Sequence, residues 1–150
     1  MSRVVGVSIV MLVAASARGQ SPSTQLEPLV SAIADARVHA ASLAEHTGSA
    51  PRHGRAAPSP EEKDASSAVV TADHELNDLM ESSPGVLPRM VDTEVLSDLN
   101  AAHDGLAAYA QARTHGNTKA MRAAARRTVE ALDRADAHLD PHKPYHIMEP

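Results

Sequence analysis

The chain has 150 residues, of which 43% are hydrophobic and 22% charged, and its formal net charge at pH 7 is -5. This length and balance predict one soluble domain, and the negative charge argues against nucleic acid or anionic membranes as partners. The sequence has no Phe or Trp and 2 Tyr, so it lacks the large side chains that fill most β-sandwich cores and ligand pockets. We therefore expect an all-α protein with a core of Ala and Leu.

Residues 1–17 have the pattern of a secretory signal peptide. Arg3 precedes an apolar run over residues 4–15, and small residues follow up to Ala17. The run has about a dozen residues, whereas a membrane-spanning helix needs roughly 20. We expect cleavage after Ala17, a secreted or periplasmic location, and no membrane span in the mature chain. An uncleaved anchor is the alternative.

An exported domain of this size often contains disulfides, but this chain has no Cys. It also has no Asn-x-Ser/Thr glycosylation acceptor. Both features fit a bacterial envelope or periplasmic protein, and a eukaryotic secreted protein is the alternative. In either setting, the stability of the fold has to come from helix packing.

A polar leader over residues 18–23 precedes the first predicted helix, over residues 24–47. Thr24 and Glu27 have the spacing of a capping box, and Pro28 falls in the predicted first turn, where its missing N–H costs little. Gly48 supplies a stop. Apolar residues recur every third or fourth position, as in one buried helix face: Leu26, Leu29, Val30, Ile33, Ala36, Ala40, Leu43 and Ala44.

A linker rich in Gly and Pro spans residues 48–59, and the second helix begins after it. We expect Ser59 to cap this helix, with Pro60 at its first position and Glu62 reaching back in a capping box. The helix ends at the sequence Ser83-Pro84-Gly85. Its expected buried residues are Ala65, Val69, Ala72, Leu76, Leu79 and Met80.

The third helix can begin in either of two registers, after Pro88 or near Asp92, and it ends at Gly116. Asn117 caps the fourth helix, which stops before Pro141. The expected buried residues of the third helix are Val91, Val95, Leu99, Ala102, Leu106 and Tyr109. Those of the fourth are Met121, Ala124, Thr128, Leu132, Ala135 and Leu139.

Four amphipathic helices with two short connections and one longer one predict an antiparallel four-helix bundle with up-down-up-down topology. The bundle spans residues 24–139, and an irregular tail rich in His and Pro follows over 140–150. Because Ala alternates with single large aliphatic residues, we expect the helices to approach closely and to leave little room for a ligand.

The C-terminal histidines His138, His142 and His146 recur every fourth residue beside carboxylates, and together they form a candidate site for a divalent transition metal. Pro141 and Pro144 argue against one helix carrying all three rings. The alternative is a solvated tail whose histidines are compositional. No other cofactor is indicated.

Other groupings have a simpler structural interpretation. His39 and His46 lie at the edge of their helix's apolar face. His74 opens a sequence like the His-Glu-x-x-His metalloprotease motif, but Asp78 stands in place of the second His. A basic patch near the start of the fourth helix suits an acidic partner, although Glu130 and Asp133 neutralise much of it. Its members are Lys119, Arg122, Arg126 and Arg127.

The interpretation we favour is a non-enzymatic structural or protein-interaction module that binds an unidentified protein or itself. The alternative is an envelope protein that binds or senses a metal through the C-terminal histidines. An enzyme using dispersed carboxylates and histidines is the least favoured, because the chain has no Gly-rich phosphate loop, no nucleophile elbow and no haem-attachment motif.

Overall fold

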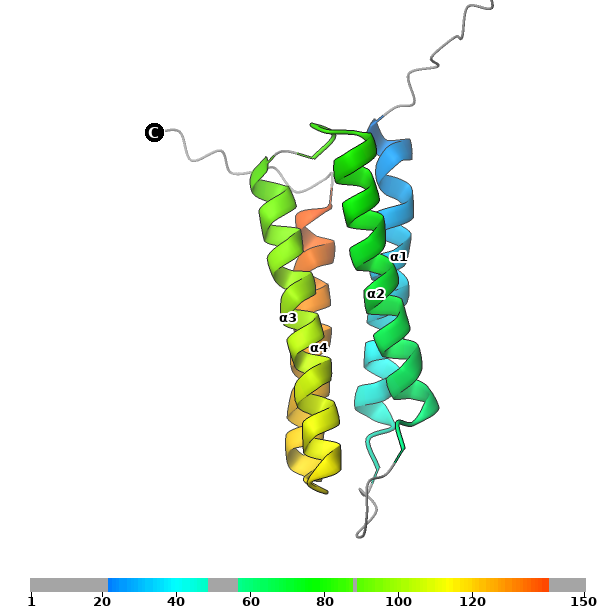
Figure 1. Cartoon of the computed structure of the whole chain (residues 1–150), viewed down its shortest axis with the longest axis vertical. Coiled ribbons are helices and arrows are strands. Elements are labelled where there is room, and N and C mark those ends of the chain that lie inside the picture. Colours follow the sequence, from blue (N-terminus) through cyan, green and yellow to red (C-terminus); the bar gives the residue numbers. More distant parts are fainter. Residues whose placement is uncertain (1–21, 49–56, 88, 141–150) are drawn as a thin grey trace, which may run out of the picture.

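Four α-helices follow one another in alternating directions in the computed structural model, which describes residues 22–48, 57–87 and 89–140 (Figure 1). They are α1 (Pro22–Glu45), α2 (Pro60–Ser82), α3 (Arg89–Thr114) and α4 (Thr118–His138), and no strand occurs within the described ranges. Each helix packs on the next one along the chain, and α4 packs back on α1. The predicted all-α, up-down-up-down bundle is therefore confirmed.

The starts of α2 and α4 follow the capping residues that the sequence predicts. The Ser59 hydroxyl accepts a hydrogen bond from the Glu62 backbone N–H at 3.2 Å, and Asn117 Oδ1 accepts one from the Ala120 N–H at 3.0 Å. Each bond satisfies one of the backbone donors that the first turn leaves without a helical partner.

The Glu62 side chain does not complete the predicted capping box. It is buried and turns toward Arg113 of α3, with Oε2 at 2.8 Å from the Arg113 Nε. The neighbouring Glu61 interacts with the helix start instead. Hydrogen bonds from its own backbone N–H and from Ser59 lower the pKa of the Glu61 carboxyl.

The start of α1 differs from the prediction. This helix begins at Pro22, so Ser23 and Thr24 are already helical and the capping box at Thr24 does not form. Pro28 lies beyond the first turn, where its ring nitrogen cannot donate to the carbonyl four residues earlier. Pro22, which belongs to the predicted polar leader, takes the favourable first position of the helix instead.

The turn between α3 and α4 is a Schellman motif. Gly116 has a φ of 67°, the left-handed conformation that glycine adopts without a Cβ penalty. The Asn117 N–H donates to the Ala112 carbonyl at 2.9 Å, and the Gly116 N–H donates to the Arg113 carbonyl at 3.0 Å. Gly116 thus ends α3 as predicted, and Asn117 at once begins the next helix. For α3 itself, the earlier of the two registers is correct, because it begins at Arg89.

The core contains most of the predicted stripes, together with further residues such as Ala32 and Ala68, and the predicted Leu26 and Ala44 are only partly buried. All the residues expected to be buried in α3 and α4 are buried. Val30 of α1 and Met80 of α2 are exposed by 37% and 39%. Each follows a buried leucine directly, and one residue turns the side chain by about 100° around a helix. The two stripes are therefore narrower than expected.

The helices α3 and α4 approach each other closely at Gly105 and Thr128. A Cβ on Gly105 would overlap the Thr128 hydroxyl and would lie 3.2 Å from the Thr128 backbone nitrogen. The hydroxyl donates to the Ala124 carbonyl at 3.1 Å, which satisfies it in the core. Because Gly105 has no side chain, the two helices can approach closely at this point.

Residues 1–17, the predicted signal peptide, lie outside the described residues, as do 49–56 of the linker and 141–150 of the tail. Among the helices that the structure describes, none combines the length and apolarity that crossing a bilayer requires.

Candidate functional site in a groove between the first and last helices

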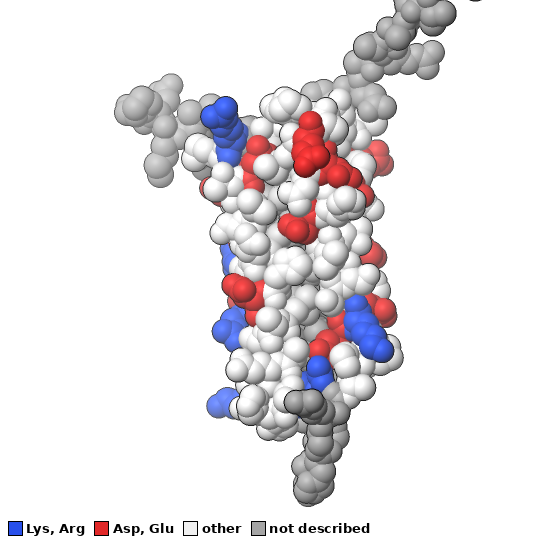
Figure 2. Space-filling view, in the orientation of Figure 1, with Lys and Arg blue, Asp and Glu red and all other residues white. Residues whose placement is uncertain are grey.

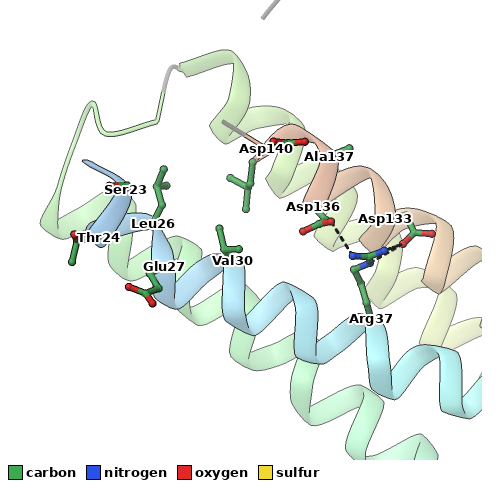
Figure 3. Close-up of a pocket in the computed structure, with 11 residues that line it drawn as sticks. Ser23, Thr24, Leu26, Glu27, Val30, Arg37, Asp133, Asp136, Ala137 and Asp140 are labelled. Carbon is green, nitrogen blue, oxygen red and sulfur yellow. Dashed lines mark hydrogen bonds and ion pairs between the residues drawn. The ribbon is translucent and has the colours of Figure 1, made fainter. Parts of the chain in front are cut away.

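A groove with a volume of about 710 Å³ runs between α1 and α4 at the end of the bundle where α1 begins (Figure 3). Ser23, Leu26 and Val30 lie along the α1 side, and Ala137 and the neighbouring aspartates lie along the α4 side. The Ala-rich stripes predict little open space between helices, and this groove shows that the prediction is wrong for α1 and α4. It opens because α1 buries a narrow stripe and turns Val30 toward the groove rather than into the core.

Arg37 crosses from α1 to α4 along the groove. Its guanidinium contacts two carboxylates, with Nη2 at 2.7 Å from Asp133 Oδ1 and Nη1 at 2.9 Å from Asp136 Oδ2. The side chain of Arg37 is 39% exposed, so water screens these ion pairs and each stabilises the fold modestly. Their geometric effect is larger, because the pairs fix the spacing of α1 and α4 beside the apolar part of the groove.

The polar rim of the groove is mainly acidic. Glu27, Asp133, Asp136 and Asp140 line it, and Arg37 is the one basic residue among its described lining residues. The apolar lining comes from Leu26, Val30, Ala137 and Leu139. An apolar floor inside a charged rim is typical of a surface that binds a partner of opposite charge.

The acidic character extends over the whole end of the bundle that contains the groove. We define this acidic end as residues 22–34, 71–82, 89–101 and 128–140. Its basic side chains, histidine aside, are Arg89 and Arg134, and Arg37 of the groove lies just beyond these ranges. Its acidic side chains are Glu27, Asp73, Glu75, Asp78, Glu81, Asp92, Glu94, Asp98, Glu130, Asp133, Asp136 and Asp140. On the face shown in Figure 2, most of the red side chains gather at this upper end and most of the blue ones lie lower.

Partial burial disfavours the charged form of one carboxyl at this end. Desolvation raises the pKa of Asp92, which lies in the first turn of α3. The other described half of the bundle balances its charges. Basic residues there include Lys63, Arg113 and the patch at the start of α4, and they are offset by acidic residues that lie mainly on α1 and α2, among them Glu45, Glu61 and Asp64. The bundle is thus electrostatically polarised along its axis.

His138 is the one described member of the three candidate metal ligands, since His142 and His146 lie outside the described residues. Its Nδ1 lies 3.0 Å from Glu94 Oε2 and its Nε2 lies 3.3 Å from Asp98 Oδ2, both on α3. Both ring nitrogens of His138 therefore face carboxylates of α3 rather than the carboxylates of its own helix.

The structure separates the carboxylates that the sequence places beside His138. Asp133 and Asp136 turn toward α1, whereas His138 turns toward α3, where Arg134 Nε donates to Asp98 Oδ1 at 2.8 Å. Within the described ranges, no three His, Cys, Asp or Glu side chains are grouped so that they could hold a metal ion. Metal binding by the full histidine set stays a prediction.

The remaining sequence candidates lie on exposed helix faces. His39 pairs with Asp35 at 3.7 Å, and His74 pairs with Asp78 at 3.6 Å, each one helical turn apart. His46 Nδ1 lies 2.8 Å from the Ser42 carbonyl. In the basic patch of α4, Arg122 Nε donates to the Thr47 carbonyl at 3.4 Å. The three histidines thus contact their own helix, as the structural interpretation predicted. Asp133, which was expected to neutralise part of the basic patch, pairs with Arg37 of α1 instead.

Sequence reasoning missed the groove and its arginine. Arg37 lies in an ordinary polar stretch of α1, and its partners are 96 and 99 residues away along the chain. The one available signal was the abundance of acidic residues near the ends of the four predicted helices, which an up-down-up-down topology brings together at one end.

Comparisons of this chain with protein-family models, with curated proteins and with solved structures gave no match.

Proposed function

We propose that this protein is a non-enzymatic interaction module whose acidic end binds a cationic protein surface. The polarised charge carries the proposal, because twelve acidic side chains gather at one end of the bundle against Arg89, Arg134 and the Arg37 of the groove, whereas the charges are balanced elsewhere. A field of one sign steers a partner of opposite charge and orients it during encounter. An exported location, which the N-terminal sequence predicts, places such an encounter outside the cytoplasm.

The ion pairs in the groove and beside it on α3 support binding over catalysis. Asp133 and Asp136 are engaged with Arg37, and Asp98 is engaged with Arg134 and His138. A general acid or base has to reach a proton of the substrate, whereas these carboxylates hold neighbouring helices. Because Asp98, Asp133 and Asp136 serve in structural ion pairs, a partner would interact mainly with other exposed acidic side chains, such as Glu27 and Glu81.

The test compares two triple charge reversals with the same net charge. Glu27, Asp78 and Glu81 change to Lys at the acidic end, and Glu45, Asp64 and Asp104 change to Lys elsewhere; all six are exposed. Binding of an oligolysine peptide is measured by isothermal titration at several salt concentrations. We expect the acidic-end variant to lose about tenfold in affinity and to show a weaker salt dependence, since three exposed charge contacts contribute roughly 0.5 kcal/mol each.

The control variant retains most of the affinity if the acidic end is the binding surface. Equal losses in both variants would mean that peptide binding follows net charge alone, and the proposal would then be wrong. Circular dichroism of each variant verifies that the bundle is intact.

A further inference from the structure

The groove between α1 and α4 has an apolar floor that oligolysine alone would not use. Val30 is 37% exposed, and its side chain lies beside Leu26 on the α1 side (Figure 3). Leu139 is buried at the base, and Ala137 is a small residue on the α4 side. The groove is open to solvent, and its volume of about 710 Å³ is comparable with that of ligand pockets, roughly 300–1,000 Å³.

The walls of the groove are two antiparallel helices of the bundle. A third helix packs naturally against such a pair, because its side chains enter the depression between the two helices. An amphipathic helix would insert residues spaced three and four apart, and its flanking Lys or Arg side chains would meet the carboxylates of the rim. The exposed Glu27 on the α1 wall is placed for this contact.

We propose that the α1–α4 groove receives the apolar face of a cationic amphipathic helix from a partner protein. This inference rests on the proposed function and specifies its partner. The acidic end supplies attraction, and the groove supplies recognition of the spacing of apolar residues. Charge complementarity selects this occupant, because the rim carries four carboxylates and a single guanidinium, which leaves it with a net negative charge.

The experiment uses the full chain and two synthetic peptides with the same composition of Lys and Leu. One peptide has Leu at helical spacing over roughly four turns, and the other is a scramble that forms no apolar face. We expect the patterned peptide to bind at least about tenfold more tightly. Equal affinity for both would overturn the groove inference, while binding that depends on the acidic end would still support the proposed function.

Two matched pairs of variants locate the contact. Ala137→Phe fills the groove, and Ala123→Phe places the same ring on an exposed position of α4 outside it. Val30→Ser makes the floor polar, and Val38→Ser does the same at a position that is 66% exposed on α1. We expect Ala137→Phe and Val30→Ser each to weaken the patterned peptide several-fold without changing the scramble, and the two controls to bind as the original chain does.

Three results would overturn this inference. One is unchanged binding of the patterned peptide by both groove variants. Another is a chain that sediments as a dimer and becomes monomeric with Ala137→Phe, which would assign the groove to a second copy. The third is tighter peptide binding after Ile147 and Met148 are changed to Ser, which would assign the groove to the chain's own C-terminal segment. Denaturation midpoints near that of the original chain exclude misfolding as the cause of any loss.

Discussion

In α1 and α2 the buried residues follow a narrow stripe, with one pair of adjacent buried residues in each helix, at 32–33 and 68–69. The helices α3 and α4 each bury two such pairs, at 98–99 and 105–106 and at 124–125 and 131–132. The wider strip depends on small side chains, above all Gly105 against Thr128. A helix pair can thus bury more of its surface by removing side-chain volume at the contact.

The same difference affects how far the surface opens between helices. The narrow stripe of α1 leaves Val30 beside the groove of about 710 Å³, whereas the hollow between α3 and α4, which form the second hairpin, has a smaller volume of about 350 Å³. Ion pairs join the hairpin of α1 and α2 to the hairpin of α3 and α4 at two seams. At the α2–α3 seam Arg113 pairs with Glu62, and at the α1–α4 seam Arg37 pairs with two aspartates. The first pair is buried and the second is exposed.

The largest expected effect comes from breaking the buried seam. Arg113→Ala leaves the Glu62 carboxylate in the interior, where removing one partner of a buried ion pair costs about 3–5 kcal/mol. We expect a loss of this size in the free energy of unfolding, measured by urea denaturation. The exposed Arg126→Ala on α4 is the control and should change stability by less than about 0.5 kcal/mol.

A double variant sharpens this prediction. Changing Glu62 and Arg113 together to Met removes both charges and keeps apolar volume, so most of the stability should return. A double variant as unstable as Arg113→Ala would mean that the seam depends on the shape of the arginine rather than on its charge.

The next effect tests the close packing of the second hairpin directly. Gly105→Ala improves helix propensity by about 1 kcal/mol but forces a Cβ against Thr128, and overpacking of this kind costs about 1–3 kcal/mol. We expect a net loss of roughly 1 kcal/mol in thermal or urea unfolding. Ser97→Ala, exposed on the same helix, should have little effect, and a stabilising Gly105→Ala would contradict the close approach.

The exposed seam should respond more weakly. Arg37→Ala removes two ion pairs whose side chains are partly exposed, so the loss should be within about 1 kcal/mol and should shrink in high salt. Unfolding at low and high ionic strength measures both effects. A loss as large as that of Arg113→Ala would show that burial does not distinguish the two seams.

The smallest effect is a pair of opposite pH dependences at the starts of α2 and α3. The pKa of Glu61 is lowered from 4.5 by its hydrogen bonds, so its contribution to stability is present above that value and is lost as pH falls through the folded pKa. The pKa of Asp92 is raised from 3.8 by burial, so its ionisation destabilises the fold as pH rises through its folded pKa.

We therefore expect Glu61→Gln to be less stable than the original chain at pH 7 and equal to it in acid. Asp92→Asn should be more stable at pH 7 and should lose that advantage below its unfolded pKa. Denaturation at several pH values measures both differences, and effects of the same sign in the two variants would contradict the assigned causes.

Most of the fold could be predicted because local signals agree with it. Ser59, Asn117 and Gly116 mark helix ends through backbone hydrogen bonds with residues near them in sequence. The start of α1 was predicted too late, because Thr24 and Glu27 imitate a capping box inside a helix that Pro22 begins. Glu62 also left its predicted place, since Arg113 of another helix offers its carboxylate a buried partner.

The candidate site was far less predictable. The metal hypothesis placed His138 with neighbours in sequence, whereas the helix faces direct it to Glu94 and Asp98 on α3. The groove combines residues from both ends of the described chain, and its width depends on how α1 and α4 pack rather than on either sequence segment.

By itself, the sequence determined the four helices, their order and most of the core, because helical periodicity and capping act within a few residues. Only the tertiary structure decided which arginine meets which carboxylate, how closely α3 approaches α4 at Gly105, and that α1 and α4 leave a groove at the acidic end. These features depend on contacts between segments far apart in the chain, and such contacts follow from the shapes of the packed faces as a whole.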